Sequence, residues 1–186
     1  MIVGFAERSF CPGQIIIPPK ADYHSRQSRD RKDKVYMNIS ILSPSDGEII
    51  SLSAVPDEAF SSGMLGEGVA VKPQGGMIFA PACGRIGTVS ENGHAYSIES
   101  EDFDLLVHIG VDTLSLGGVF EPMVKAGQKV AAGEPLCRVD FGKIRAAGLC
   151  DYVILLITEN KTDAEVKIHK GPARGGKDTA MVFMNN

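Results

Sequence analysis

The 186-residue sequence contains no tryptophan, only 6% aromatic residues and no long apolar run. Its longest apolar stretches, such as residues 152–157, are far too short to cross a bilayer, which excludes a chain that spans a membrane. The first residues include Glu7 and Arg8 and have neither a basic start nor an extended apolar segment. No secretory signal is therefore indicated, and the expected location is the cytoplasm.

The four cysteines are widely separated, and no Cys-x-x-Cys pair occurs. This spacing excludes a zinc ribbon and a thioredoxin-like redox pair. The net charge of −4 is unevenly distributed, because residues 1–38 carry seven Lys and Arg against four Asp and Glu, whereas the remainder carries twelve against nineteen. An acidic folded part disfavours binding to nucleic acid and favours a basic protein partner.

The chain divides into a polar N-terminal segment and a longer segment with a regular pattern of short apolar runs. Residues 1–38 include Pro18-Pro19 and the charged stretch 22–34, which no core could absorb, so we expect a flexible N-terminal extension. The alternative for this segment is a basic arm that binds an acidic surface. Residues 39–186 are rich in glycine and apolar residues and are long enough for one core, so they are expected to form a single domain.

Short β-branched runs between Gly, Pro and Ser residues are typical of an all-β protein. We predict a single-domain antiparallel β-sandwich or flattened barrel, with short helical turns only at residues 55–60 and 142–149. The expected strands are residues 39–42, 48–52, 69–72, 77–79, 85–89, 96–98, 104–109, 129–131, 136–140, 152–157, 165–168 and 179–183.

Two internal repeats indicate a quasi-duplicated hybrid, or barrel-sandwich, layout. The pattern Pro-x-x-Gly-x-Ile occurs at residues 44–49 and again at 81–86, each time as a turn that leads into a strand. The segment around Gly127 and Gly133 looks like the paired-glycine turns of biotinyl and lipoyl carrier barrels. Neither Met-Lys-Met nor Asp-Lys-Ala is present as a site of attachment, so this likeness concerns architecture.

Two of the four histidines are candidates for chemistry. His94 opens the predicted strand 95–100, and His108 lies within the apolar run 104–112. By strict alternation, Leu106 and Asp104 share the face of His108, and a short connection at residues 101–102 would pair the two segments as a hairpin. Such a hairpin brings the two imidazoles together, which suggests either zinc binding or phosphoryl transfer through a phosphohistidine.

Several separate motifs then point to one family when they are taken in order. They are Ile49 with Val55-Pro56-Asp57 and Phe60, residues 66–73, Ala80-Pro81, residues 84–87, residues 92–100 and residues 106–113. Together they resemble the glucose-class enzyme IIA of the bacterial phosphoenolpyruvate-dependent sugar phosphotransferase system, over about residues 39–182.

The resemblance implies a phosphocarrier that needs no metal and no cofactor. His108 matches the histidine that accepts a phosphoryl group on Nε2 from the phosphocarrier protein HPr and passes it to a cysteine of a sugar-specific IIB domain. His94 matches its companion, which stabilises the added charge, and the carbonyl of Gly110 is the expected partner of His108 Nδ1. Such a protein can also signal sugar supply to metabolic enzymes or transporters through its phosphorylation state.

The family docks its partners on a shallow apolar face around the two histidines. The matching apolar positions are Phe60, Met64, Leu65 and Leu106, and the matching acids are Asp57 and Asp112. For Phe60 and Leu106, packing in the core is the alternative role. The two acids are expected to meet basic side chains of HPr.

The chain departs from the family pattern at two positions near the companion histidine. Asn92 stands where the best-known members have a threonine that hydrogen-bonds this histidine, and an asparagine can make the same bond. Ser90 stands where those members have an exposed phenylalanine, so contact with particular partners should be weaker or altered.

A zinc-dependent hydrolase with a duplicated β layout is the alternative function. His108 and Asp112 have the spacing of a His-x-x-x-Asp ligand pair, but the sequence has no His-x-His motif. The pair His94 and His108 could also hold an adventitious zinc ion if a partner supplied a carboxylate. The sugar stays open among glucose, N-acetylglucosamine, maltose and β-glucosides.

Overall fold

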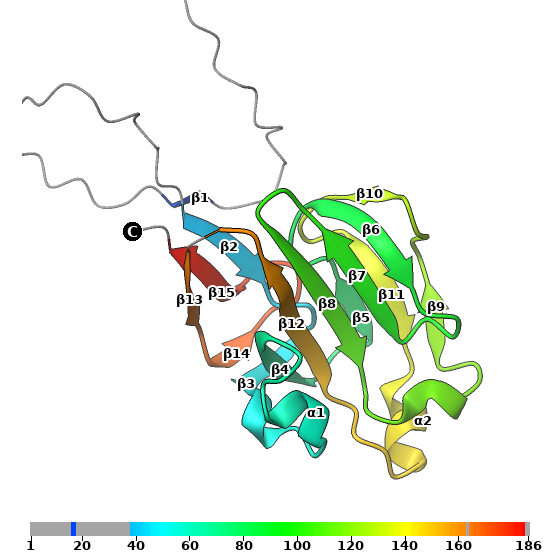
Figure 1. Cartoon of the computed structure of the whole chain (residues 1–186). Helices are drawn as coiled ribbons and strands as arrows, with labels where there is room; N and C mark the ends of the chain where they lie inside the picture. The colour runs from blue at the N-terminus through cyan, green and yellow to red at the C-terminus, as the bar shows by residue number, and fades with distance from the viewer. Residues whose placement is uncertain (1–15, 18–37, 163, 185–186) are drawn as a thin grey trace, which may run out of the picture.

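The computed structural model describes residues 16–17, 38–162 and 164–184, and it consists almost entirely of antiparallel β-structure (Figure 1). Its helical segments are η1 (Leu52–Ala54), α1 (Glu58–Ser61), η2 (Thr113–Ser115) and α2 (Phe141–Ala146). The strands are β1 (Ile16–Ile17), β2 (Asn38–Leu42), β3 (Gly47–Ser51), β4 (Glu67–Pro73), β5 (Met77–Phe79), β6 (Gly84–Val89), β7 (Ala95–Glu99), β8 (Phe103–Ile109), β9 (Phe120–Pro122), β10 (Lys129–Val130), β11 (Pro135–Val139), β12 (Val153–Asn160), β13 (Glu165–Ile168), β14 (Gly171–Ala173) and β15 (Thr179–Met184).

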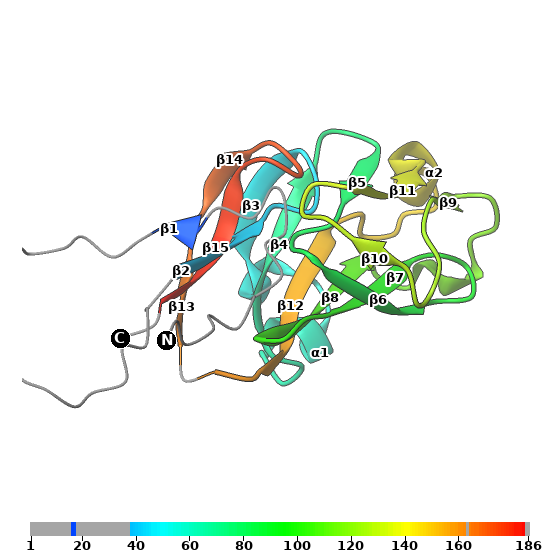
Figure 2. The ribbon, with the colours of Figure 1, turned by 90° about the horizontal axis from the view of Figure 1, so that it is seen from above.

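The strands form three sheets that share one core. An eight-stranded sheet has the order β10-β6-β7-β8-β12-β4-β3-β14, a four-stranded sheet the order β1-β2-β15-β13, and a three-stranded sheet the order β5-β11-β9. Figure 2 shows the four-stranded sheet at the left and the three-stranded sheet at the right, with β12, β8, β7 and β6 of the eight-stranded sheet extending below them. Buried residues from all three sheets form the largest apolar cluster, including Ile41, Ile78, Leu105, Leu136 and Met181.

The prediction of an all-β sandwich is therefore confirmed. The sheets are open, so the alternative of a closed, flattened barrel is not what the structure shows. Within the described ranges, each sheet has two edge strands and none closes into a barrel. The two-residue strand β1 pairs with β2 through Ile16 opposite Ile39. Apart from these two residues and Asn38, the predicted N-terminal extension lies outside the described residues.

The structure differs from the predicted elements in a few places. The strands β9 and β14 were not predicted, since each has only three residues and contains a proline, which weakens a strand signal. The predicted helical turn at residues 55–60 is observed as α1, which starts later at Glu58, and η1 is a separate turn before it that was not predicted. They are separate because Val55 is extended and Asp57 begins a new helix as its N-cap, accepting from the backbone N–H of Phe60 at 3.2 Å.

The two sequence repeats are joined to each other by backbone hydrogen bonds. The N–H of Phe79 donates to the carbonyl of Pro44 at 2.8 Å, and the N–H of Leu42 donates to that of Pro81 at 2.7 Å. Each proline turn is thus held by the strand that precedes the other turn. This crosswise arrangement is the structural form of the quasi-duplication that the sequence predicts.

Gly133 has a second reason to be glycine besides its backbone conformation. Gly127 and Gly133 both have positive φ values, 84° and 82°. A Cβ on Gly133 would lie 2.7 Å from the carbonyl oxygen of Gly176, whereas no described atom lies within 4 Å of a Cβ on Gly127. The two glycines therefore share the same backbone conformation, but only at Gly133 would an added Cβ also overlap a neighbouring atom.

We expect Gly133→Ala to lower the free energy of unfolding by about 3 kcal/mol, from backbone strain and steric overlap together. Gly127→Ala should cost only the backbone strain, about 1 kcal/mol. Urea unfolding of the two variants measures the difference directly. Equal losses would show that the contact between Gly133 and Gly176 is not a tight one.

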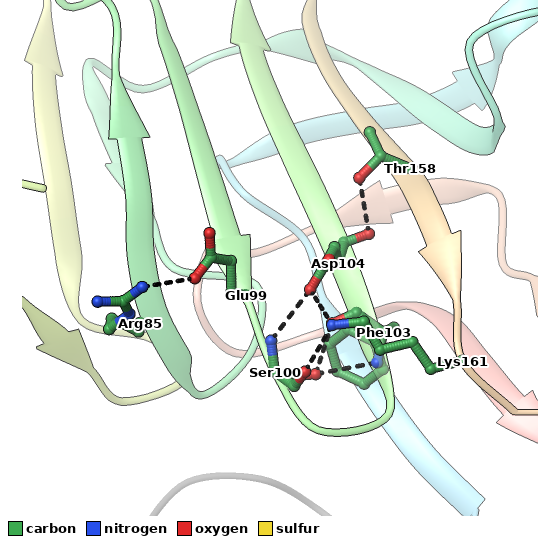
Figure 3. A network of polar contacts seen from close by, with 7 residues as sticks. All are labelled: Arg85, Glu99, Ser100, Phe103, Asp104, Thr158 and Lys161. Carbon is green, nitrogen blue, oxygen red and sulfur yellow. Dashed lines mark hydrogen bonds and ion pairs between the residues drawn. The ribbon is translucent and has the colours of Figure 1, made fainter. Parts of the chain in front are cut away.

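The β7–β8 hairpin, which carries the candidate site at one end, is fixed at its other end by a polar network (Figure 3). Glu99 and Asp104 lie directly opposite each other, an arrangement that two like charges alone would destabilise. Arg85 pairs with Glu99 at 3.1 Å, and Lys161 pairs with Asp104 at 2.6 Å. Lys161 also donates to the carbonyl of Ser100 at 3.0 Å, which ties the hairpin turn to the end of β12. The network thereby helps to set the register of the hairpin.

Candidate functional site

The hairpin of β7 and β8 brings the two histidines into contact. Ala95 pairs with His108, and the N–H of Ile109 donates to the carbonyl of His94 at 2.8 Å. The imidazole centroids lie 4.9 Å apart with their planes at 80°. Two imidazoles from positions 14 residues apart thus form one site at one end of the β7–β8 hairpin, which lies inside the eight-stranded sheet.

Alternation along β8 determines which side chains accompany His108. Phe103, Leu105, Val107 and Ile109 are buried on one face of the strand. The other face presents Asp104, Leu106 and His108, which are only partly buried. The strand therefore displays His108 on a face that a partner can reach, as the sequence pattern predicts.

His108 is held by the backbone that follows its strand. Its Nδ1 lies 2.9 Å from the carbonyl oxygen of Gly110. Because a carbonyl only accepts, Nδ1 carries the proton and the lone pair is on Nε2. Gly110 has a φ of 72°, and a Cβ there would lie 2.4 Å from the Cγ2 of Thr113, so glycine is required on both counts.

Asn92 fixes the tautomer of His94 in a similar way. Its Nδ2 donates to the carbonyl oxygens of Leu114 at 2.9 Å and Thr113 at 3.3 Å, which sets the orientation of the amide. Its Oδ1 therefore faces His94, accepting from the backbone N–H at 3.2 Å and contacting the ring Nδ1. An amide oxygen cannot donate, so His94 Nδ1 carries the proton and its Nε2 is also unprotonated when the ring is neutral.

Both imidazoles are held in the neutral form by their surroundings. Burial lowers the pKa of His94. Burial also lowers the pKa of His108, and the neighbouring charge of His94 lowers it further, while the Gly110 carbonyl and Asp57 act in the opposite direction. Neutral imidazole is the nucleophilic form, so His108 has a free lone pair on Nε2 at neutral pH.

Asp57→Asn should lower the pKa of His108 further, because it removes a negative charge that favours the imidazolium. The α1 cap should survive, since asparagine is as good an N-cap as aspartate. An NMR titration of the His108 ring measures the shift. An unchanged or raised pKa would show that Asp57 does not act on His108 through its charge.

The predicted partner-face residues differ widely in exposure. Phe60 is only 8% exposed and packs in a second apolar cluster, with its ring centroid 5.0 Å from that of His108. Leu106 is half-buried against the same cluster. Met64 and Leu65 are 84% and 45% exposed, so these two offer most of the apolar surface among the predicted positions.

The two predicted acids have different structural settings. Asp57 is half-buried, caps α1 and influences the pKa of His108. Asp112 is exposed and has a φ of 59°, in the left-handed region, where it leads from β8 into η2. Asp57 therefore belongs to the immediate surroundings of His108, whereas Asp112 lies exposed on the loop that follows β8.

Sequence reasoning missed two contacts of His94. The Oγ of Ser90 lies 3.0 Å from the His94 Nδ1, and the ring of Phe120 lies 6.3 Å from the His94 ring between centroids. A serine at the end of a strand and four residues before a histidine is a weak signal for such a turn contact. Phe120 comes from β9, and no sequence pattern links it to His94.

A metal site of three ligands is not formed around the histidine pair. In the described part of the chain, no group of three or more His, Cys, Asp or Glu residues is placed to hold a metal ion. The zinc-hydrolase alternative thus finds no ligand set there. The described helices are also too short for any of them to cross a membrane.

Comparisons with known proteins agree with this geometry. Residues 39–163 match the model of the family described as phosphoenolpyruvate-dependent sugar phosphotransferase system, EIIA 1. A glucoside-specific EIICBA component of Staphylococcus carnosus is 35% identical over 145 residues, which are 76% of this chain and 21% of that protein. A glucose-specific EIICBA component of Streptococcus pneumoniae is 36% identical over 153 residues, 81% of this chain and 20% of that protein. The chain therefore spans about a fifth of the length of these relatives.

A solved structure matches over most of its length. Glucose permease IIA from Mycoplasma capricolum superposes with a TM-score of 0.71 and 34% sequence identity. The match covers 78% of this chain and 95% of that one. The likeness therefore extends over nearly the whole of the IIA structure and includes its arrangement of sheets.

Proposed function

The chain belongs to the EIIA 1 family of the phosphoenolpyruvate-dependent sugar phosphotransferase system, and on this premise we propose that it carries a phosphoryl group on His108. It accepts the group from phosphorylated HPr and donates it to a cysteine of a sugar-specific IIB domain. The observation that supports this most is the pair of neutral imidazoles 4.9 Å apart, with His108 Nδ1 bound to the Gly110 carbonyl.

In the first step, the lone pair of His108 Nε2 attacks the phosphorus of phosphohistidine on HPr. A new P–N bond forms as the old P–N bond breaks, and the HPr imidazole leaves with the electron pair of that bond. The proton stays on His108 Nδ1 throughout, hydrogen-bonded to the Gly110 carbonyl, so the ring acts as a nucleophile without a separate base. The loose transition state needs in-line positioning and charge stabilisation rather than covalent help.

His94 is proposed to stabilise the charge that the phosphoryl group brings. Its ring lies edge-on to that of His108, and its Nδ1 proton is committed to Asn92. A second proton can therefore be taken only at Nε2, which gives an imidazolium beside the phosphorylated ring. Such a cation stabilises the phosphoryl oxygens when they are transferred.

In the second step, a cysteine thiolate of the IIB domain attacks the same phosphorus. A P–S bond forms, the P–N bond to His108 breaks, and the imidazole regains its lone pair on Nε2. The EIICBA names of the relatives support a IIB domain as the acceptor. The names of these relatives, glucoside-specific and glucose-specific, support a sugar of this class as the proposed one without selecting one member.

The proposed docking face combines the exposed Met64 and Leu65 with the charge of Asp57 and Asp112. A basic surface on HPr would complement these acids, and the half-buried Leu106 would border the phosphoryl group. Phosphorylation changes the charge of this face, so it can also regulate other proteins that dock there. The proposed place of action is the cytoplasm.

The proposal is tested by reconstitution with purified enzyme I, HPr, a IIB domain and phosphoenolpyruvate. We expect labelled phosphate to reach the IIB cysteine only when this chain is present. Phosphoryl transfer from HPr to IIB at the same rate without the chain would contradict the proposed role.

A further inference from the structure

Ser90 lies at the turn between β6 and β7 and closes it in an unusual way. The N–H of Ser90 donates to the carbonyl of Ala95 at 2.9 Å, as in a regular hairpin. The carbonyl of Ser90 instead accepts from the N–H of Gly93 at 2.9 Å, within the turn. The N–H of Ala95 therefore donates to the Ser90 hydroxyl, also at 2.9 Å. The hydroxyl takes the place that a backbone carbonyl would fill.

This position brings the same hydroxyl to the companion histidine. Ser90 Oγ lies 3.0 Å from His94 Nδ1, the ring nitrogen that also contacts Asn92 Oδ1. Because the orientation of Asn92 requires Nδ1 to be the donor, its N–H faces two oxygen acceptors. The oxygen of Ser90 accepts from Ala95 and from His94 at once, which its two lone pairs allow.

We infer that Ser90 is a positioning residue for His94, which holds its Nδ1 proton and orients its ring toward His108. This inference rests on the proposed function, since it assigns Ser90 a part in the transfer that His94 assists. The turn joins the two roles of the serine, because the hydroxyl that closes the hairpin is the one that contacts the ring. Ring orientation is thereby coupled to the geometry of the β6–β7 turn.

Ser90 is a second hydrogen-bond acceptor for His94 Nδ1, besides Asn92, and its effect depends on whether the His94 ring is charged. Hydrogen bonds to a charged group are about twice as strong as those between neutral groups, so Ser90 and Asn92 stabilise the imidazolium more than the neutral ring. The titratable group that faces His94 from the adjoining strand β8 is His108. Asp57, the N-cap of α1, raises the pKa of His108 through its negative charge. Phe120 covers another side with an apolar ring. Removal of the Ser90 hydroxyl should therefore make His94 harder to protonate.

Ser97 provides a matched control on the same hairpin. Its Oγ accepts from the N–H of Thr88 at 2.7 Å, a contact of the same kind as that between Ser90 and Ala95. Ser97→Ala therefore removes a hydroxyl that supports the hairpin and leaves the contacts of His94 with Ser90 and Asn92 in place. Ser90→Thr retains the hydroxyl and serves as the conservative variant.

The experiment follows the His94 ring nitrogens by NMR during a pH titration and, separately, the rate of phosphoryl donation to IIB. We expect Ser90→Ala to lower the pKa of His94 and to slow donation about fivefold, the effect of one hydrogen bond. Ser97→Ala should change neither quantity by a comparable amount, and Ser90→Thr should restore both.

The inference is overturned if Ser90→Ala leaves the pKa of His94 where it is in the parent protein, or if its donation rate equals that of Ser97→Ala. Failure of the proposed function has a different signature. In that case the parent protein itself takes up no phosphate, while the titration of His94 still shows whether Ser90 contacts the ring.

Discussion

Replacing His108 with alanine is expected to abolish phosphoryl acceptance, with a fall of at least 1,000-fold in the rate of labelling by phosphorylated HPr. The variant lacks the lone pair on Nε2 that forms the new P–N bond. The Nε2 of His94 is also unprotonated in the neutral ring, so this variant also tests whether the two imidazoles have different roles. The measurement is the initial rate of phosphate incorporation with enzyme I, HPr and phosphoenolpyruvate.

The control for this variant is His169→Ala. His169 is exposed, and its backbone N–H, which the substitution keeps, donates to the carbonyl of Ala180 at 2.9 Å. This variant should be labelled at the rate of the parent protein. Near-parental labelling of His108→Ala would mean that another residue accepts the phosphoryl group and that the assignment is wrong.

Replacing His94 with glutamine is expected to separate the two steps. Acceptance should stay within a few-fold of the parent rate, because the His108 lone pair and its Gly110 contact are unchanged. Donation to IIB should slow by about 100-fold, since glutamine cannot become a cation beside the phosphoryl oxygens. Rapid-quench measurement of each half-reaction gives the two rates.

An equal loss in both half-reactions would contradict a companion role for His94. A stability measurement excludes the simpler cause, a disturbed hairpin. Ser97→Ala again supplies the comparison, since the Ser97 hydroxyl accepts from the N–H of Thr88 and so supports the β6–β7 hairpin, whose turn contains His94. If the glutamine variant unfolds at the same denaturant concentration as Ser97→Ala, a difference in donation between the two reflects the side chain at position 94.

Much of the fold could be predicted because it follows from local patterns. The alternation along β8 gave both its buried face and the position of His108 on the other face. The repeated proline turns predicted the duplication, because each places a glycine and a buried isoleucine at the same offsets. The strands β9 and β14 were missed because three residues with a proline carry too little pattern, and pairing with longer neighbours stabilises them.

The candidate site was predicted less completely, since several contacts depend on distant parts of the chain. The contact of Asn92 with His94 is local, and the resemblance indicated it. The carbonyls of Thr113 and Leu114, which orient the Asn92 amide, lie about 20 residues farther along the chain. Phe120 likewise reaches His94 only through the packing of β9. No sequence period connects such residues.

For some partner-face residues, the sequence alone could not predict whether the side chain is buried or exposed. A phenylalanine in a short helical turn can face either solvent or core, and here Phe60 is buried in one cluster with Ile154 and Leu156. Met64 and Leu65 are exposed because they lie in the turn between α1 and β4, flanked by glycines at positions 63 and 66. The roles of these residues in docking remain proposals.

The central claim is that Nε2 of His108 carries the phosphoryl group, and locating that group tests it most directly. The chain, labelled with ¹⁵N, is phosphorylated with phosphoenolpyruvate, enzyme I and HPr and examined by NMR and peptide mass analysis. We predict one acid-labile phosphate on His108, bonded to Nε2, with Nδ1 still protonated and hydrogen-bonded to the Gly110 carbonyl. A phosphate on any other residue or on Nδ1, or no incorporation at all, would contradict the claim.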